Sequence, residues 1–120
     1  MSKRVEKPWG HELIWSVTDQ YAAKVIHISA GKRLSLQYHN IKQESVLVLS
    51  GVLLLHLGEG DAARVMTLQV GDSHDIPAGE VHRFEAPDDT DVDIIEVSTP
   101  HLDDVVRLED DYNREGTTAP

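Results

Sequence analysis

Residues 34–57 read LSLQYHNIKQESVLVLSGVLLLHL, and this stretch decides the fold of the chain. Apolar and polar side chains alternate along it in short runs, which is typical of half-buried β-strands. Such runs, rich in Val, Ile and Leu, predict nine strands, at residues 12–17, 22–29, 34–39, 45–49, 52–57, 64–69, 73–76, 81–85 and 92–97. Turn residues such as Ser50-Gly51 and Gly71-Asp72 separate them. The pattern favours an all-β sandwich or jelly roll.

The chain has 120 residues, which is enough for one compact domain and too few for a second. We expect this domain to occupy residues 1–115. The apolar spacing within residues 102–109 predicts a short helical segment near the end of the domain. Residues 116–120 are expected to form a disordered tail.

The charge of the chain disfavours nucleic acid as a partner, but its distribution leaves room for an anionic ligand. Lys plus Arg number 11 against 21 Asp plus Glu, a net charge of −10, which disfavours a nucleic-acid partner. Between residues 22 and 57, however, Glu44 is the only acid, so this region is locally positive and suits an anionic ligand. The longest apolar stretch is too short for a membrane helix and the first residues lack a signal-peptide pattern. We therefore expect a cytoplasmic protein with no membrane contact.

A candidate metal site follows from the positions of a few polar residues. The chain has no cysteine, so any metal must rest on histidine, carboxylate or amide ligands. Gln37 and His39 lie two residues apart on a predicted strand and so share a face, and Glu44 would open the next strand. His82 follows the turn at residues 77–79, which could return the chain to the same interior. These four side chains could hold Zn, Mn, Fe, Co or Ni, although spacing alone leaves polar residues at strand ends as an equal alternative.

Two sets of residues resemble the two sequence motifs of the cupin superfamily: Gly31, Gln37, His39, Glu44 and Gly51, followed by Gly71, Pro77, Gly79 and His82. The run at residues 34–39, with glutamine in place of the usual first histidine, resembles the isomerase domain of type II mannose-6-phosphate isomerases. Residues 6–10 resemble the Pro-Trp-Gly entry of that domain, and residues 104–114 resemble its ending. The resemblance covers nearly the whole chain and implies a single-domain cupin jelly-roll barrel.

The resemblance also implies an activity, the interconversion of an aldose phosphate and a ketose phosphate, most simply mannose 6-phosphate and fructose 6-phosphate. One divalent ion would be held by the ligands implied for the family: Gln37, His39, Glu44 and His82. The reaction needs a base that moves a proton between adjacent carbons, and Lys24, Glu96 and His74 are the candidates. Lys24 interrupts an apolar strand, so we expect burial to lower its pKa.

A sugar-phosphate ligand needs cations to hold its phosphate, and the planar guanidinium of arginine suits this role. Arg33, Lys42, Arg107 and Arg114 are available. The resemblance favours Arg107 and Arg114, which match arginines of the family ending. Arg83 follows His82 on a strand and should point to the opposite face.

Two other functions remain open at this point. Lys42 and Val46 stand where the family usually has arginine and tryptophan, which favours a metal-containing cupin that binds a sugar or another metabolite without converting it. His39, His82 and Glu44 would also form the two-histidine, one-carboxylate set of an iron-dependent oxygenase. The chain has no room for the nucleotidyl-transfer domain found in longer relatives. Because small jelly rolls often pair through edge strands, we expect a homodimer.

Overall fold

The structure is a computed structural model and describes residues 2–117. Its strands are β1 (Lys3–Lys7), β2 (Gly10–Val17), β3 (Ala22–Ile28), β4 (Leu36–Tyr38), β5 (Glu44–Ser50), β6 (Leu53–Leu57), β7 (Arg64–Leu68), β8 (Ser73–Ile76), β9 (His82–Glu85), β10 (Val92–Ser98) and β11 (Val106–Glu109). Within residues 2–117 the only helical element is a 3-10 turn, η1 (Gly60–Ala62). No helix of this part of the chain is long and apolar enough to cross a bilayer.

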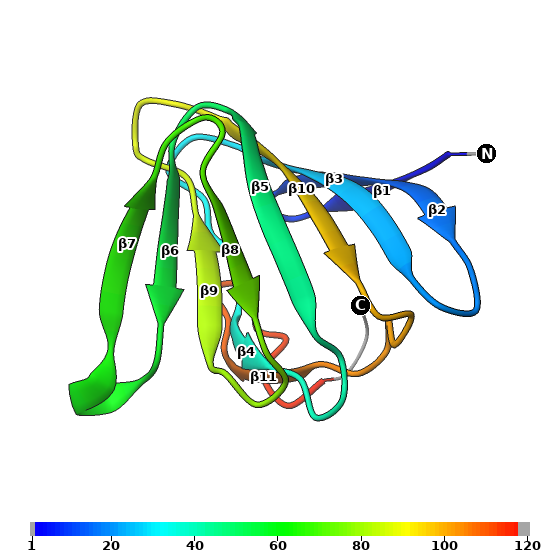
Figure 1. The fold of residues 1–120 in the computed structure, drawn as a ribbon. Coiled ribbons are helices and arrows are strands. Elements are labelled where there is room, and N and C mark those ends of the chain that lie inside the picture. Colours follow the sequence, from blue (N-terminus) through cyan, green and yellow to red (C-terminus); the bar gives the residue numbers. More distant parts are fainter. Residues whose placement is uncertain (1, 118–120) are drawn as a thin grey trace.

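The strands form two antiparallel sheets that face each other as a barrel (Figure 1). The larger sheet has the order β1-β2-β3-β10-β5-β8, and the smaller has the order β11-β4-β9-β6-β7. Neighbours such as β10 and β5, or β9 and β6, are far apart in sequence, as a jelly roll requires. The all-β jelly-roll prediction is confirmed. β4 and β11 lie together at the lower end of the barrel in Figure 1.

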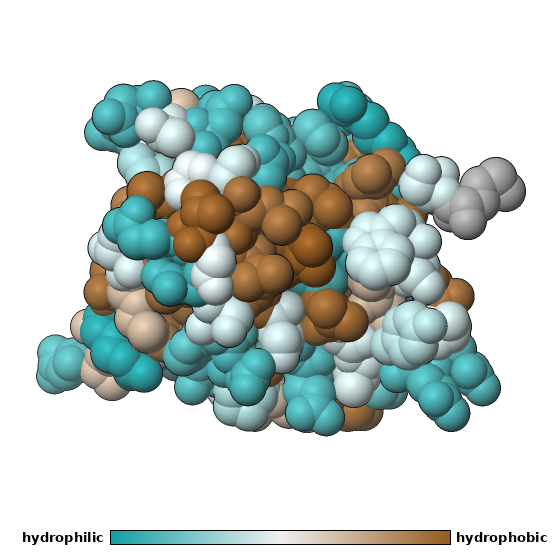
Figure 2. Space-filling view, turned by 45° about the horizontal axis from the view of Figure 1, so that its top comes forward, coloured by the Kyte–Doolittle hydropathy of each residue, from teal (hydrophilic) through white to brown (hydrophobic). Residues whose placement is uncertain are grey.

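The core fills the space between the two sheets. Along β5, Val46 and Val48 are buried while Leu47 and Leu49 face outward, as the two-residue period of a strand dictates. Phe84 and the inward leucines of β6 are almost fully buried against them. The outward apolar residues also gather, and Figure 2 shows hydrophobic side chains concentrated on one face of the molecule.

The structure corrects the prediction for the end of the domain. Residues 102–109 form no helix; they contain the strand β11, which pairs with β4 and places Arg107 opposite Gln37. Pairing satisfies the strand's backbone groups, and the β-branched Val106 favours an extended chain. The strand β1, which pairs with β2, was also not predicted. Of the residues expected to form a disordered tail, Gly116 donates its N–H to the carbonyl oxygen of Arg107 at 3.1 Å, and residues 118–120 lie outside the described residues.

One turn between strands requires glycine for two separate reasons. Gly51, between β5 and β6, has φ of +75°, in the left-handed region that other residues avoid. A side chain there would also run into the backbone carbonyl of Asp91. Gly71, between β7 and β8, has φ of +90° but faces open space. A substitution at Gly71 would therefore meet backbone strain alone, whereas one at Gly51 would meet backbone strain and a steric clash.

Candidate metal centre

Three ligand side chains meet inside the barrel, each from a different strand end. His39 follows β4, Glu44 opens β5 and His82 opens β9. Their ligand atoms lie within 4.8 Å of one another, and Glu44 Oε1 is 2.8 Å from His82 Nε2 and 3.5 Å from His39 Nε2. All three side chains are at most 3% exposed. Among residues 2–117, no other group of three histidine or acidic side chains comes together in this way.

Main-chain carbonyl groups fix the orientation of both imidazole rings. His39 Nδ1 lies 2.6 Å from the carbonyl oxygen of Asp104, and His82 Nδ1 lies 2.9 Å from that of Glu80. A carbonyl oxygen can only accept a hydrogen bond, so each Nδ1 carries a proton and each Nε2 is the nitrogen that faces Glu44. This arrangement is common around metal-binding histidines. Burial opposes the charged form of His82, but its contact with Glu44 raises its pKa above the usual value.

Among residues 2–117, the ligand atoms of the cluster have few partners outside it. The buried Nε2 atoms of His39 and His82 face only Glu44 Oε1, and Glu44 Oε2 has the ion pair with Lys42. Buried polar atoms normally have partners, because leaving one unsatisfied costs about 1–3 kcal/mol. A divalent cation would satisfy all of them at once, so the residues present fit a metal ion.

Gln37 adjoins this cluster but is already partly engaged. It pairs with His82 on one side and with Arg107 on the other, so these three side chains lie in a row across β9, β4 and β11. The Gln37 Oε1 atom accepts a hydrogen bond of 2.7 Å from the hydroxyl of Ser35. A carbonyl oxygen has a second lone pair, so Gln37 as a fourth ligand stays a prediction.

A chain of buried charges continues from the metal ligands across the larger sheet. Lys42 Nζ lies 3.3 Å from Glu44 and 3.6 Å from Glu96. Lys24 Nζ lies 3.5 Å from Glu96 and 3.2 Å from Glu12. All five side chains are buried, so the strand positions of Lys24 and Glu96 place them inside the barrel.

The chain of charges corrects one expectation about Lys24. Burial alone would lower the pKa of Lys24, but the carboxylates of Glu96 and Glu12 raise it above its usual value. The pKa of Glu96 lies above that of an ordinary carboxyl, because burial and the charge of Glu44 raise it to about 7. Burial also opposes the charge of Glu44, but its contacts with Glu96, His39 and His82 hold its pKa well below the usual value. Within this pair, Glu96 is therefore the carboxyl that takes a proton.

Glu12 was missed by the sequence analysis. It lies on β2 opposite Ile26 of β3 and faces the interior. The sequence offered one signal: Glu12 lies at the start of a predicted strand, and the next predicted strand carries Lys24, a charge among apolar residues.

A narrow cavity of about 40 Å³ lies beside the metal ligands. Its polar lining comprises Lys7, Glu12, Lys24, Ser35, Gln37, His39, Lys42, Glu96, Arg107 and Arg114. Five of these side chains are cationic and two are carboxylates, so the lining favours an anion. The apolar part of the wall comes from Trp9, Ile26, Leu34, Phe84, Leu102 and Val105.

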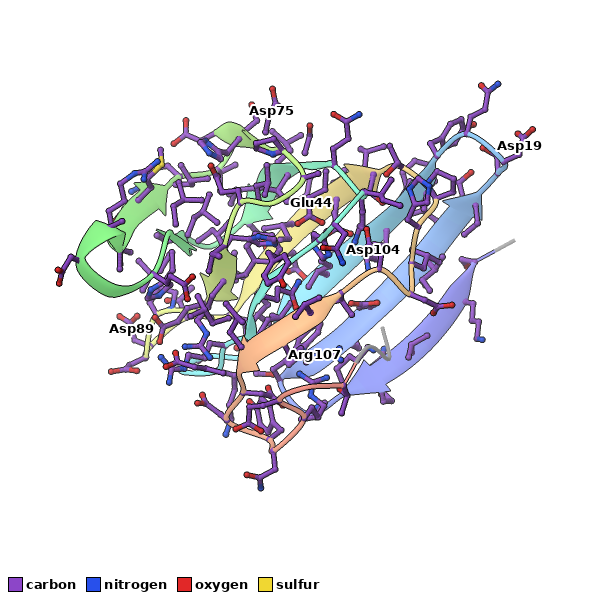
Figure 3. All side chains as sticks on the ribbon, turned by 90° about the horizontal axis from the view of Figure 1, so that it is seen from below. Asp19, Glu44, Asp75, Asp89, Asp104 and Arg107 are labelled. Atoms are coloured by element: carbon purple, nitrogen blue, oxygen red, sulfur yellow. The ribbon has the colours of Figure 1, made fainter. Side chains whose placement is uncertain are left out.

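The two arginines favoured for phosphate binding both reach the cavity. Arg107 is buried, and burial and the neighbouring Arg114 lower its pKa. Its Nη1 atom donates to Thr117 at 2.9 Å, whereas its Nε atom has no hydrogen-bond partner among residues 2–117. Arg114 makes a two-pronged contact with Asp110, at 2.8 and 3.1 Å. Figure 3 shows Arg107 on β11, with Glu44 deeper between the sheets.

Three other sequence candidates lie away from the cavity. Arg33 is half-exposed, binds the Asp111 carboxylate at 2.7 and 2.9 Å and does not line this cavity, so a role for it in substrate binding stays a prediction. Arg83 points away from His82, as expected, and donates to the carbonyl oxygen of Leu34. His74 does not line the cavity either.

Comparison with known proteins identifies the family. The model of the family described as mannose-6-phosphate isomerase C-terminal matches residues 1–110. The chain belongs to this family. The cupin identity predicted from the two motifs is thereby confirmed.

Curated relatives of this cupin are much longer proteins. XanB of Xanthomonas campestris pv. campestris, a xanthan biosynthesis protein, is 33% identical over 115 residues, which are 93% of this chain and 24% of XanB. The mannose-1-phosphate guanylyltransferase ManC of Salmonella typhimurium is 34% identical over 117 residues, which are 95% of this chain and 24% of ManC. The chain thus spans about a quarter of the length of these relatives.

Solved structures support the fold of this cupin. CapF, a capsular polysaccharide assembling protein of Staphylococcus aureus, superposes with a TM-score of 0.81 at 23% identity, over 91% of this chain and 34% of CapF. KdgF of Halomonas sp. superposes with a TM-score of 0.73 at 20% identity, over 84% of this chain and 88% of KdgF. At these identities the likeness concerns the fold alone.

The comparisons overturn the expected aldose–ketose isomerase. The curated relatives whose names state a reaction are mannose-1-phosphate guanylyltransferases, which catalyse a different reaction. The conversion of mannose 6-phosphate to fructose 6-phosphate was therefore the wrong activity to infer from the motifs. A proton-transfer role for Lys24 and Glu96 stays a prediction that has no reaction assigned to it.

Proposed function

We propose that this cupin holds one divalent metal ion and binds a sugar phosphate beside it. The observation that carries the proposal is the orientation of His39 and His82. Each ring donates a hydrogen bond from Nδ1–H to a main-chain carbonyl and turns Nε2 toward the buried carboxylate of Glu44. A histidine that served only to fill the core would not need this arrangement.

The metal would be held by His39, Glu44 and His82, with Gln37 as a further candidate. Nitrogen and oxygen donors of this kind suit Zn, Mn, Fe, Co or Ni. When bound, such an ion supplies a positive charge that binds and polarises a ligand oxygen. The chain's own contribution is to turn both Nε2 atoms toward the site and to keep the carboxylate of Glu44 ionised.

The opposite part of the cavity would hold the anionic group of the ligand. Arg107, Arg114 and Lys7 line it. Burial lowers the pKa of Lys7, and the charges of Arg114 and Arg107 add a smaller repulsion in the same direction. An anion would relieve this repulsion and give the Arg107 Nε atom a partner. Lys24 and Glu12 offer a donor and an acceptor for sugar hydroxyls between the two ends. The names of the relatives, which specify mannose 1-phosphate, support a ligand of this class.

The volume of the cavity sets a condition on binding. About 40 Å³ is the space of one or a few water molecules, so a whole sugar requires the wall to move. The segment after β10 supplies Leu102, Val105, Arg107 and Arg114 to that wall. We expect this segment to shift outward when a sugar phosphate enters.

The test is calorimetric titration of mannose 1-phosphate and mannose 6-phosphate into protein loaded with Zn²⁺ or Mn²⁺, with inorganic phosphate as a third probe. We expect binding of at least one sugar phosphate, tighter than that of phosphate and weakened at least tenfold by removal of the metal. Arg107→Ala should weaken it further without loss of metal. Arg33→Ala, which removes an arginine from the surface pair with Asp111, is the matched control and should bind as the wild type does. No binding of any sugar phosphate to the metal-loaded protein would contradict the proposed ligand class.

The homodimer and the cytoplasmic location remain predictions. Molar mass measured by light scattering in solution tests the first, with about 27 kDa expected for a dimer of the 13.4 kDa chain. A monomeric mass at micromolar concentration would contradict it.

A further inference from the structure

Asp104 lies between β10 and β11 and contacts the segment that carries the metal ligands (Figure 3). Its carbonyl oxygen accepts the 2.6 Å hydrogen bond from His39 Nδ1. Its carboxylate accepts three more, from the backbone N–H groups of Asn40 at 3.0 Å, Ile41 at 2.7 Å and Lys42 at 2.8 Å. One residue thus holds both a ligand ring and the loop that follows it.

The loop at residues 40–42 has the geometry of an anion site that the protein fills itself. Three successive backbone N–H groups that converge on one point form a nest for an anion. Here the anion is the carboxylate of Asp104. Desolvation opposes its charge, but these hydrogen bonds lower the pKa of Asp104 to about 2, so it is ionised near neutral pH.

The position of this loop decides whether the ligands can meet. Residues 40–43 join His39, which directly follows β4, to Glu44 at the start of β5, and these strands belong to different sheets. The loop crosses from one sheet to the other in four residues, so its shape fixes the distance between the two ligand atoms. Gly79 donates its N–H to the carbonyl oxygen of His39 at 2.7 Å and supports the same crossing from the other side.

We propose that Asp104 is a positioning residue of the metal centre, whose carbonyl orients the His39 ring through Nδ1 and whose carboxylate fixes the crossing that brings His39 to Glu44. The inference rests on the proposed function, because it assumes that these side chains bind a metal. Asp104 acts through His39 and the loop, and it is neither a metal ligand nor a group that contacts substrate.

The test compares Asp104→Asn with Asp103→Asn in the full chain. The asparagine turns one acceptor oxygen into an N–H₂ group that faces backbone donors, whereas Asp103 is exposed and its replacement removes the same charge one residue away. Competition with a chromogenic chelator measures the Zn²⁺ affinity of metal-stripped protein. We expect about 10- to 100-fold weaker Zn²⁺ binding for Asp104→Asn, the usual effect of losing an outer partner of a ligand, and no change for Asp103→Asn.

Two readouts without metal separate positioning from a general loss of structure. Nitrogen NMR of the apo protein should show the Nδ1–H tautomer of His39 in wild type and Asp103→Asn, and a mixture of tautomers in Asp104→Asn. Amide exchange should speed up at residues 40–42 and stay unchanged in β6. Asp104→Glu keeps the charge but displaces it by one methylene, and it should also weaken Zn²⁺ binding. This variant replaces Asp104→Asn in the test if the asparagine variant does not fold.

The outcomes distinguish this inference from the proposed function. If wild type binds Zn²⁺ and Asp104→Asn binds it as tightly with an unchanged His39 tautomer, only the role of Asp104 is refuted. If wild type binds no divalent ion, the proposed function fails and this inference fails with it.

Discussion

Replacing Lys24 with methionine should strongly destabilise the protein, because it removes the cation paired with Glu12 and leaves Glu96 with Lys42 alone, at 3.6 Å. Lys24 Nζ lies 3.2 Å from Glu12 and 3.5 Å from Glu96, and the three side chains are only 4–10% exposed. Removing one partner of a buried ion pair typically costs about 3–5 kcal/mol, because the remaining charge is left without compensation. The matched control is Arg4→Met, whose pair with Glu6 is 59% and 71% exposed and should be worth about 0–1 kcal/mol.

The assay is urea unfolding of metal-stripped protein, followed by circular dichroism. We expect the Lys24→Met loss to be larger at pH 8.5 than at pH 5.5, because Glu96, with a pKa of about 7, can take up a proton and shed its charge at the lower pH. Adding Glu12→Gln to Lys24→Met should restore part of the stability, since it removes one of the two buried carboxylate charges that lost Lys24. A loss no greater than that of Arg4→Met, at either pH, would refute the view that these charges are buried together.

Two further predictions concern stability and pH. Burial opposes the charge of Asp110, but Arg114 lowers its pKa below the usual 3.8; Asp110→Asn should therefore destabilise the protein at pH 7. The difference from wild type should shrink as pH falls below 3.8, because there the unfolded carboxyl binds its proton before the native one does. A difference in urea unfolding that does not shrink at all below pH 3.8 would contradict this. Gly71→Ala should cost about 1–2 kcal/mol for its left-handed backbone alone, whereas Gly51→Ala should cost more because the new methyl also meets the carbonyl of Asp91. Equal losses in thermal unfolding would show that the contact at Gly51 relaxes freely.

The sequence predicts the fold and the ligand cluster because both depend on local patterns. Alternation places Gln37 and His39 on one face of a strand whatever that strand pairs with. The short connection to Glu44 and the turn before His82 limit where those residues can lie. The order of the two motifs and the family resemblance then favour a ligand cluster over polar residues at strand ends, a choice that spacing alone leaves open.

Features that depend on pairing between distant segments could not be predicted in the same way. Residues 102–109 satisfy the helical period and a short strand equally, and only the contact with β4 decides between them. Arg33 resembled the other arginines until its partner, Asp111, came from 78 positions away. Glu12 faces inward because of its register with β3, which composition does not reveal. The contacts of Asp104 with residues 40–42 likewise join segments over 60 positions apart.

The central claim is that His39, Glu44 and His82 form a metal site, and metal binding to stripped protein tests it most directly. Calorimetric titration of Zn²⁺ and Mn²⁺ should give one ion per wild-type chain. His82→Ala should abolish that binding, whereas His56→Ala, which removes a histidine paired with Glu85 elsewhere on the molecule, should leave it intact. One ion bound by wild type and lost only with His82 is the predicted result. Absence of binding to wild type, or equal binding to His82→Ala, would contradict the account.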